Sequence, residues 1–205
     1  MNKARDRDLV RLHWPVTLRP AFDALFGIDQ AMADVVVRAT EPALAAIKLA
    51  WWREQLEDLD TQAPPAETRL QAAAVVLLPK GVTGRELAGL EAGWATLLDE
   101  VPQVELIEAR GKMLFELGAR LLGGSCEGVA EAGRLYAMMD VTRRELADLR
   151  GAAGVPASQR FPAVLRPLTA LASLARRDFL RGTDEPQATP GRSWALMRHR
   201  MTGRT

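Results

Sequence analysis

The carboxylates that could bind a metal ion are spread through this chain without an obvious pairing. Asp29 and Asp34 are five residues apart, which on a helix separates them by about 140° around the axis, so their side chains diverge. Glu57 and Asp60 are three residues apart, but with Asp58 between them they are better explained as the solvated acidic end of a helix. Taken on their own, these residues predict no paired carboxylate site.

Nucleophilic catalysis has equally little support. Cys126 is the single cysteine, and it follows a Gly-Gly-Ser sequence that is typical of a turn. A thiol nucleophile needs a nearby base, and the two histidines, His13 and His199, lie near the chain ends. One cysteine also excludes an internal disulfide and favours a reducing compartment.

Two adjacent tryptophans, Trp51 and Trp52, are the strongest candidate for a ligand-binding feature. Neighbouring residues on a helix are about 100° apart, so the two rings cannot point the same way. They could line a prenyl or quinone-like tail, but aromatic side chains at helical spacing more often fill a core. Leu44 and Ile47 recur with Trp51 at helical spacing, and we expect this set to form the buried face, with Trp51 in the core.

Three basic residues could meet an anion. Lys48 and Arg53 flank the tryptophan pair, and Arg19 precedes the first long helix. Lysine keeps a positive charge but lacks the two-pronged hydrogen bonding of arginine. Surface or ion-pair positions are the simpler interpretation for all three.

The composition is that of one folded domain. A chain of 205 residues can bury a sizeable core, and a net charge of +1 creates no global field for nucleic acid or an anionic membrane. No segment approaches the roughly 20 unbroken apolar residues that span a bilayer, and the charged N-terminus lacks the apolar run of a signal peptide. We expect a cytoplasmic protein that binds no nucleic acid, with peripheral membrane contact left open.

The C-terminal region is locally basic, with Arg192, Arg198, Arg200 and Arg204 close together in sequence. Each basic residue near an anionic membrane contributes about 1 kcal/mol of binding. A solvated run of charge explains these arginines equally well and is the preferred interpretation.

The expected elements are all helical, because Ala, Leu, Arg and Glu dominate and no period-two alternation is sustained. Pro42 suits a first helical turn, and Thr83 with Glu86 predicts a capping box. Seven or eight helices are expected, over about 20–38, 42–59, 67–78, 83–100, 102–122, 127–150, 161–180 and 193–199. The linkers are too short for a domain boundary, so we expect a single domain over 1–205, partly flexible over 1–18 and 182–205.

Several of these segments resemble the squalene/phytoene synthase family. The stretch 39–60, ATEPALAAIKLAWWREQLEDLD, is similar to the Glu-Pro…Ile-(Arg/Lys)-Leu-x-Trp-Trp-Arg helix of that family and is the most specific match. Segment 19–34 looks like the first catalytic helix of the family. Segments 160–165 and 177–180 resemble its C-terminal part, and 193–198 the tail of its short relatives, whereas 103–155 matches only in being helical. The resemblance implies an all-α single-domain bundle, a trimmed isoprenoid synthase fold.

For the family's enzymes the resemblance implies head-to-head prenyl transfer. Two aspartate clusters, with carboxylates four residues apart, would hold the Mg²⁺ that neutralises the leaving pyrophosphate. The first cluster would fall at Asp34, where the residue four positions on is Arg38. The second would fall at Asp140, which is followed four positions on by Arg144, unless its helix is deleted.

We therefore expect a degenerate, non-catalytic family member with no cofactor. It would bind an isoprenoid or lipid-like ligand, or act with a protein partner in assembly, as the short relatives of respiratory complex I assembly do. Two alternatives stay open: an active prenyl-diphosphate transferase that uses Mg²⁺, and a helical interaction module without a ligand. The ligand-binding positions that the resemblance implies are Arg19, Asp34, Lys48, Trp52 and Arg53.

Overall fold

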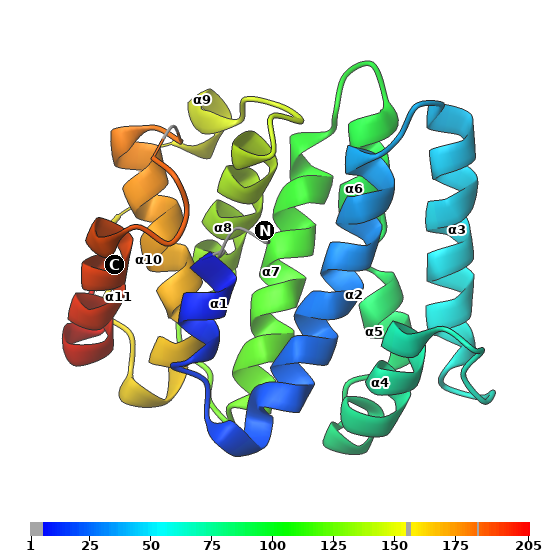
Figure 1. Ribbon diagram of the computed structural model, residues 1–205, viewed down its shortest axis with the longest axis horizontal. Helices are drawn as coiled ribbons and strands as arrows, with labels where there is room; N and C mark the ends of the chain where they lie inside the picture. The colour runs from blue at the N-terminus through cyan, green and yellow to red at the C-terminus, as the bar shows by residue number, and fades with distance from the viewer. Residues whose placement is uncertain (1–5, 155–156, 184) are drawn as a thin grey trace.

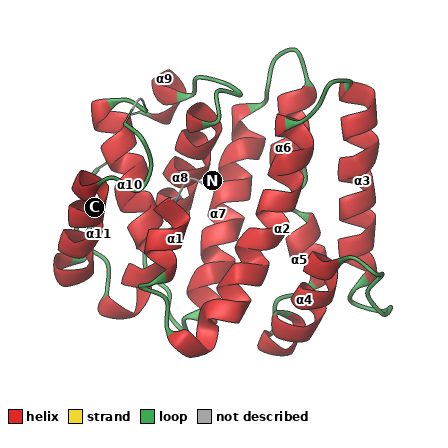
Figure 2. Ribbon diagram, viewed as in Figure 1, coloured by secondary structure: helices red, strands yellow, loops and turns green. Residues whose placement is uncertain are grey.

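The computed structural model describes residues 6–154, 157–183 and 185–205, and within these ranges it is all-helical (Figure 2). This confirms the predicted all-α class. The longer helices are α2 (Arg19–Val37), α3 (Pro42–Asp58), α4 (Thr68–Val76), α7 (Val104–Leu121), α8 (Val129–Arg143), α10 (Arg166–Arg181) and α11 (Pro190–Thr202). The short helices are α1 (Asp6–Arg11), α5 (Gly84–Ala88), α6 (Ala92–Ala95) and α9 (Arg150–Ala153). Single 3-10 turns lie at η1 (Val16–Leu18), η2 (Leu78–Lys80), η3 (Thr96–Leu98) and η4 (Ala163–Leu165).

The long helices stand in a row, from α3 at one edge through α2, α7, α8 and α10 to α11 at the other (Figure 1). The central pair, α7 and α8, shares the most extensive contact. Helix α1 lies against α10 and α11, so segments from the two ends of the chain meet at one edge of the row. No described helix combines the length and the apolar character that crossing a bilayer requires.

Local sequence signals account for several helix boundaries. Pro42 occupies the first turn of α3. The predicted capping box is confirmed: the hydroxyl of Thr83 accepts from the backbone N–H of Glu86 at 3.2 Å, and the Glu86 carboxylate accepts from the Thr83 N–H at 2.9 Å. The single helix predicted over 83–100 is wrong, because the chain breaks into α5, α6 and η3. Gly89 and Gly93 fall in this segment, and glycine disfavours an uninterrupted helix by about 1 kcal/mol relative to alanine.

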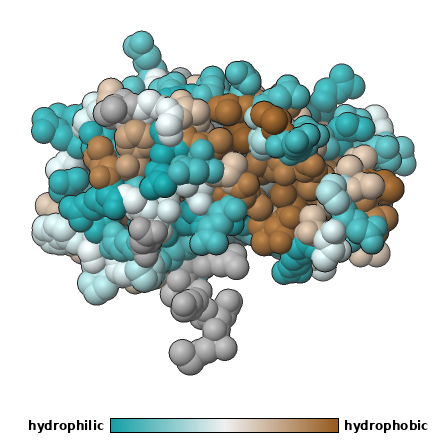
Figure 3. Space-filling view, turned by 90° about the horizontal axis from the view of Figure 1, so that it is seen from above, coloured by the Kyte–Doolittle hydropathy of each residue, from teal (hydrophilic) through white to brown (hydrophobic). Residues whose placement is uncertain are grey.

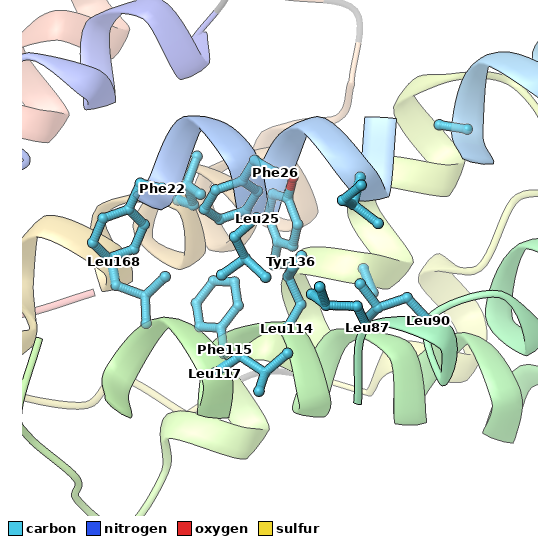
Figure 4. Packing of buried hydrophobic residues seen from close by; sticks show 14 of the residues in the cluster. Phe22, Leu25, Phe26, Leu87, Leu90, Leu114, Phe115, Leu117, Tyr136 and Leu168 are labelled. Carbon is cyan, nitrogen blue, oxygen red and sulfur yellow. The ribbon is translucent and has the colours of Figure 1, made fainter. Parts of the chain in front are cut away.

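Aromatic side chains form the centre of the core between α2, α7 and α8. The ring of Trp14 stacks on Phe22 at 4.9 Å between centroids, and Tyr136 approaches Phe26 edge-on at 6.3 Å. Figure 4 shows the α2 side chains facing Phe115 and its neighbours on α7. Stacked and edge-on pairs of this kind add about 0.5–1.5 kcal/mol each to the free energy gained by burial.

The buried face of α3 differs from the predicted one. Trp52 is buried, whereas Trp51 is 40% exposed and Ile47 is 65% exposed. The prediction that Leu44, Ile47 and Trp51 form the core face is therefore wrong. Apolar residues at helical spacing occur on both sides of this helix, and contact with α5 and α2 selects the side of Ala45, Leu49, Trp52 and Leu56.

Helix α1 was not predicted, and it ties the start of the described chain to its end. The Arg192 guanidinium binds both oxygens of Asp6, with Nε donating to each at 2.9 Å. Both residues are buried, Arg192 almost completely. The partial flexibility of 1–18 and 182–205 stays a prediction, and residues 1–5 and 184 lie outside the described part of those segments.

Candidate functional site

A buried network of charges joins α2, α7 and α8. Arg110 of α7 donates to Asp29 of α2 at 2.9 Å, and its other terminal nitrogen lies 3.7 Å from the Asp140 carboxylate of α8. The indole N–H of Trp94 donates to the same Asp29 oxygen at 2.9 Å, and its ring lies 3.8 Å from the Arg110 guanidinium carbon. Arg110 and Asp29 have no exposed side-chain surface. Two aspartates from different helices thus converge on one arginine.

The position of Arg110 follows from the pattern of α7. Ile107 and Leu114 lie three residues before it and four after it, and both are fully buried, so Arg110 falls on the apolar face of its helix. Gly93 makes room, because a Cβ there would lie 2.5 Å from the Cβ of Arg110. A buried guanidinium is tolerated only when it is paired, and Asp29 provides the partner.

A second arginine also engages Asp140. Arg144, the residue that caps the C-terminus of α8, donates to Asp140 at 3.0 Å and to the Gln30 side-chain oxygen at 3.1 Å. Burial alone would raise the pKa of Asp140, but the charges of Arg144 and Arg110 outweigh it and lower that pKa. Asp140 is therefore an ionised, arginine-bound carboxylate at neutral pH.

A cavity of about 270 Å³, which we call the arginine-lined cavity, borders this network on the side of α1 and α10. Its wall combines a charged and polar part with an aliphatic part. It is lined by Asp6, Arg7, Gln30, Tyr136, Met139, Asp140, Arg143, Arg144, Leu171, Leu174, Ala175, Asp178, Gln187 and Arg192. Such a wall suits a ligand with a polar head and a short hydrocarbon portion.

The lining carboxylates are each paired with arginine. Arg192 binds Asp6 and Asp178, and Arg143 donates to Asp178 at 3.0 Å. Asp140 is bound by Arg144, as described above. None of these three aspartates therefore presents an uncompensated negative charge to the cavity.

Arg7 differs from the other lining arginines in its partners. It donates to the carbonyl oxygen of Phe26 at 3.1 Å and to Gln30 at 3.3 Å, and its guanidinium lies 5.3 Å from the Phe26 ring centre. Within the described chain, no carboxylate lies at ion-pair distance from it. Arg7 can therefore accept an anionic group without breaking an existing ion pair.

Tyr136 adds a neutral hydrogen-bond donor to the same wall. Burial, followed by the charge of Asp140, raises its pKa to about 12. The phenol thus stays protonated at physiological pH, and its O–H is available to donate. Arg7 and Tyr136 together give the cavity one charged and one neutral donor for an anion.

Three of the sequence-predicted site residues meet in a different place. Asp34, Lys48 and Trp52 line a cavity of about 370 Å³ between α2 and α3, with Arg38 and Arg69 beside them. Asp34 lies 3.5 Å from Arg69 and accepts from the Gln30 amide at 2.7 Å. Among the described residues its ion-pair partner is thus Arg69 rather than Arg38, the cation four positions on.

The other two predicted residues lie elsewhere. Arg53 is 3.9 Å from Glu91, outside the α2–α3 cavity. Arg19 begins α2, whereas Asp34 lies near its end, and the Arg19 guanidinium donates to the Leu12 carbonyl oxygen at 3.3 Å. The structure therefore brings three of the five residues together and separates the remaining two.

Two residues of this site were missed by the sequence reasoning: Arg7, which lines the cavity, and Arg110, which belongs to the adjoining charge network. Arg7 precedes the first predicted helix, and nothing local distinguishes it. Arg110 did carry a signal, since it interrupts the apolar face of the segment 104–121. An arginine at a core position predicts a buried carboxylate partner, although it does not say which one.

The carboxylates here do not fit a Mg²⁺ site. Asp29 and Asp140 each face a guanidinium, and their two negative charges are balanced by Arg110 and Arg144. Mg²⁺ demands several oxygen ligands in near-octahedral geometry and would be repelled by both arginines. Within the described residues, no group of three or more acidic, histidine or cysteine side chains is placed to hold a metal ion.

No protein-family model, curated protein or solved structure matches this chain.

Proposed function

We propose that this protein is a non-catalytic helical bundle that binds a small anionic amphiphile of isoprenoid type in the arginine-lined cavity. One observation carries the proposal: Arg7 faces the cavity with only neutral hydrogen-bond partners, while the lining carboxylates are each engaged by another arginine. The lining therefore carries a surplus of arginine over aspartate, and a phosphate-like head group would balance it.

The aliphatic part of the wall supports an amphiphile over a simple inorganic anion. Met139, Leu171, Leu174 and Ala175 line the cavity, and all four are otherwise buried. A volume of about 270 Å³ lies just below the usual range of ligand pockets, which favours a short prenyl chain. The isoprenoid class itself comes from the resemblance of the tryptophan helix to the squalene/phytoene synthases.

Binding without turnover is the expected outcome because of the arginines. Ionisation of a prenyl diphosphate needs a cation to neutralise the departing pyrophosphate, and that cation needs free carboxylates. Here Asp29 and Asp140 are committed to Arg110 and Arg144. An active transferase would have to release both carboxylates from arginine, and each buried arginine left unpaired costs about 3–5 kcal/mol.

Isothermal titration with geranyl diphosphate in the presence of EDTA tests the binding. Arg7→Met keeps the packing on Phe26 and removes the charge, so it should weaken binding at least tenfold. Arg11→Met is the matched control, because Arg11 lies on the same helix but pairs with Asp23 at an exposed site. Equal affinity in wild type and Arg7→Met would remove the basis of the proposal.

A second test of the proposal concerns the hydrocarbon part of the ligand. Ala175→Leu narrows the aliphatic part of the wall and should weaken binding of geranyl diphosphate more than binding of inorganic pyrophosphate. A parallel incubation of wild type with farnesyl diphosphate and Mg²⁺ should release no pyrophosphate. Release that exceeds the enzyme-free rate would contradict the non-catalytic assignment and favour the transferase alternative.

A second candidate function is protein assembly, favoured by the outer face of α3. Leu44, Ile47 and Trp51 are 51%, 65% and 40% exposed and lie on one side of the helix. Seen from above, the surface over the half of the molecule that holds α2 and α3 shows a broad apolar area (Figure 3). Exposed apolar patches of this kind are typical of protein contact sites.

A photo-reactive residue at position 47 tests this second candidate in cells. It should form a discrete cross-linked product, whereas the same group at Val75, which is equally exposed on α4, should not. Indistinguishable cross-linking patterns at the two positions would count against a specific partner on α3.

A further inference from the structure

Helix α11 has an outward face that is apolar. Trp194, Met197 and Met201 follow one another at intervals of three and four residues, and they are 69%, 54% and 74% exposed. The opposite side of the helix is buried through Leu196 and His199. The helix is therefore anchored by one face and presents a second apolar face to its surroundings.

Arginines surround this apolar face. A pocket of about 120 Å³ lies between α10 and α11, and Leu180, 54% exposed, stands at its edge. Its wall consists of Ser173, Arg176, Arg177, Leu180, Arg181, Ala195, Arg198, Arg204 and Thr205, with no Asp or Glu among these described residues. The pocket thus differs from the arginine-lined cavity, where aspartates alternate with arginines.

Several of these arginines are not neutralised by a neighbour. Arg177 is paired with Glu185 at 2.9 Å. Arg181, Arg198 and Arg204 have no ion-pair partner in the described part of the chain. Since the whole protein carries a net charge of only +1, this concentration of positive charge is local to the edge formed by α10 and α11.

We propose that the edge formed by α10 and α11 docks on the surface of an anionic phospholipid bilayer. The pocket between α10 and α11 would receive a lipid phosphate. Trp194, Met197 and Met201 would enter the boundary between head groups and acyl chains. Tryptophan favours that boundary, and a helix with apolar and basic faces lies in its plane. Each arginine near the lipid surface adds about 1 kcal/mol.

The combination of features selects a bilayer over other partners. A soluble anion would use the arginines but leave Trp194, Met197 and Met201 in water. An apolar protein surface would cover those three side chains but offer the arginines no anionic partner. A bilayer accommodates both, and this inference is independent of the ligand proposed for the arginine-lined cavity.

Vesicle co-sedimentation of the full chain tests the proposal. The protein should bind vesicles of phosphatidylcholine with phosphatidylglycerol and leave pure phosphatidylcholine vesicles unbound, and raised salt should weaken the binding. Trp194→Ser, and separately the pair Arg181→Glu with Arg198→Glu, should each lower binding at least tenfold. Val75→Ser and Arg85→Glu are the matched controls, since both residues are exposed on α4 and α5, remote from α11. Neither control should change the binding.

Each other outcome overturns the proposal in a recognisable way. Equal binding to neutral and anionic vesicles would remove the role of the arginines. Full competition by soluble glycerol phosphate would indicate a small-anion site. A dimer in sedimentation that Trp194→Ser abolishes would show that a second copy of the chain covers this face. Because every variant lies on the surface, an unchanged circular dichroism melt separates these outcomes from misfolding.

Discussion

Gly111 of α7 and Gly133 of α8 face each other where the two helices cross at close range. A Cβ atom added to either residue would lie 2.2 Å from the carbonyl oxygen of the other. Real Cβ atoms do not approach that closely, and the obstructing atoms belong to backbone that cannot rotate away. This crossing lets Arg110, the residue before Gly111, come within reach of Asp140 on the neighbouring helix.

Gly111→Ala should destabilise the fold by about 1–3 kcal/mol or more, because the helices must separate to admit the methyl group. Urea unfolding monitored by circular dichroism measures the change. Gly27→Ala is the control: it lies within α2 with nothing within 4 Å of an added Cβ, so the same substitution should stabilise by about 0.5–1 kcal/mol. A neutral effect of Gly111→Ala would show that the crossing is looser than described.

Arg110→Met should cost about 3–5 kcal/mol of unfolding free energy, since it leaves Asp29 buried with the Trp94 indole N–H but without a counter-charge. Adding Asp29→Asn in the same chain should recover part of that loss. Denaturation of both single variants and the double variant gives the coupling energy. Additive losses would contradict a direct ion pair.

The two tryptophans should respond very differently to truncation. Trp52→Ala should lose about 3–5 kcal/mol, because the ring is buried between α3 and the rest of the bundle. Trp51→Ala, at the exposed side, should stay within about 1 kcal/mol of wild type. Thermal melts of the pair in one buffer compare them directly, and equal losses would conflict with the observed orientation of α3.

Stability should fall in mild acid through His199. Burial lowers the pKa of this histidine, whose Nδ1 lies 3.0 Å from the Arg204 carbonyl oxygen and whose Nε2 lies 3.0 Å from the Thr169 hydroxyl. A carbonyl oxygen can only accept, so the neutral ring carries its proton on Nδ1. With a folded pKa below the unfolded value of about 6.5, the contribution is complete above that pH and is lost as the pH falls through the folded pKa.

His199→Gln should therefore flatten the dependence of unfolding free energy on pH between about 5 and 7. His13 titrates in the same direction, because burial and the charge of Arg200 lower its pKa. His13→Gln, measured alongside, separates the two contributions. An unchanged slope in His199→Gln would assign the effect to another group. Asp140 does not interfere, since its pKa lies below the ordinary carboxylate range and its window is more acidic.

Local sequence signals predicted helix starts correctly where the residues of one turn determine the cap. Pro42 and the Thr83–Glu86 pair mark helix starts correctly, since caps depend only on residues within one turn. The face of α3 was not predictable in that way, because apolar residues follow helical spacing on both sides of it. Which side is buried depends on where α5 and α2 lie, and that cannot be inferred from the sequence of α3 alone.

The candidate site was harder to predict from the sequence than the fold. Asp29 and Asp34 were expected to diverge on their helix, and they do: one binds Arg110 in the interior and the other pairs with Arg69. Arg144 was noted only as the residue four positions after Asp140, and in the structure the two side chains pair. The convergence of Asp29 and Asp140 on Arg110 was not predicted, because these residues come from three helices far apart in sequence and only the packing brings them together.

The ion pair between Asp6 and Arg192 has a consequence for folding during synthesis. The two residues are 186 positions apart, and synthesis at about 5–20 residues per second separates their emergence from the ribosome by roughly 10–40 s. During that interval Asp6 lacks its counter-charge, whereas Arg11 of the same helix can already pair with Asp23. The contact of α1 with the C-terminal helices therefore forms only after translation has delivered Arg192.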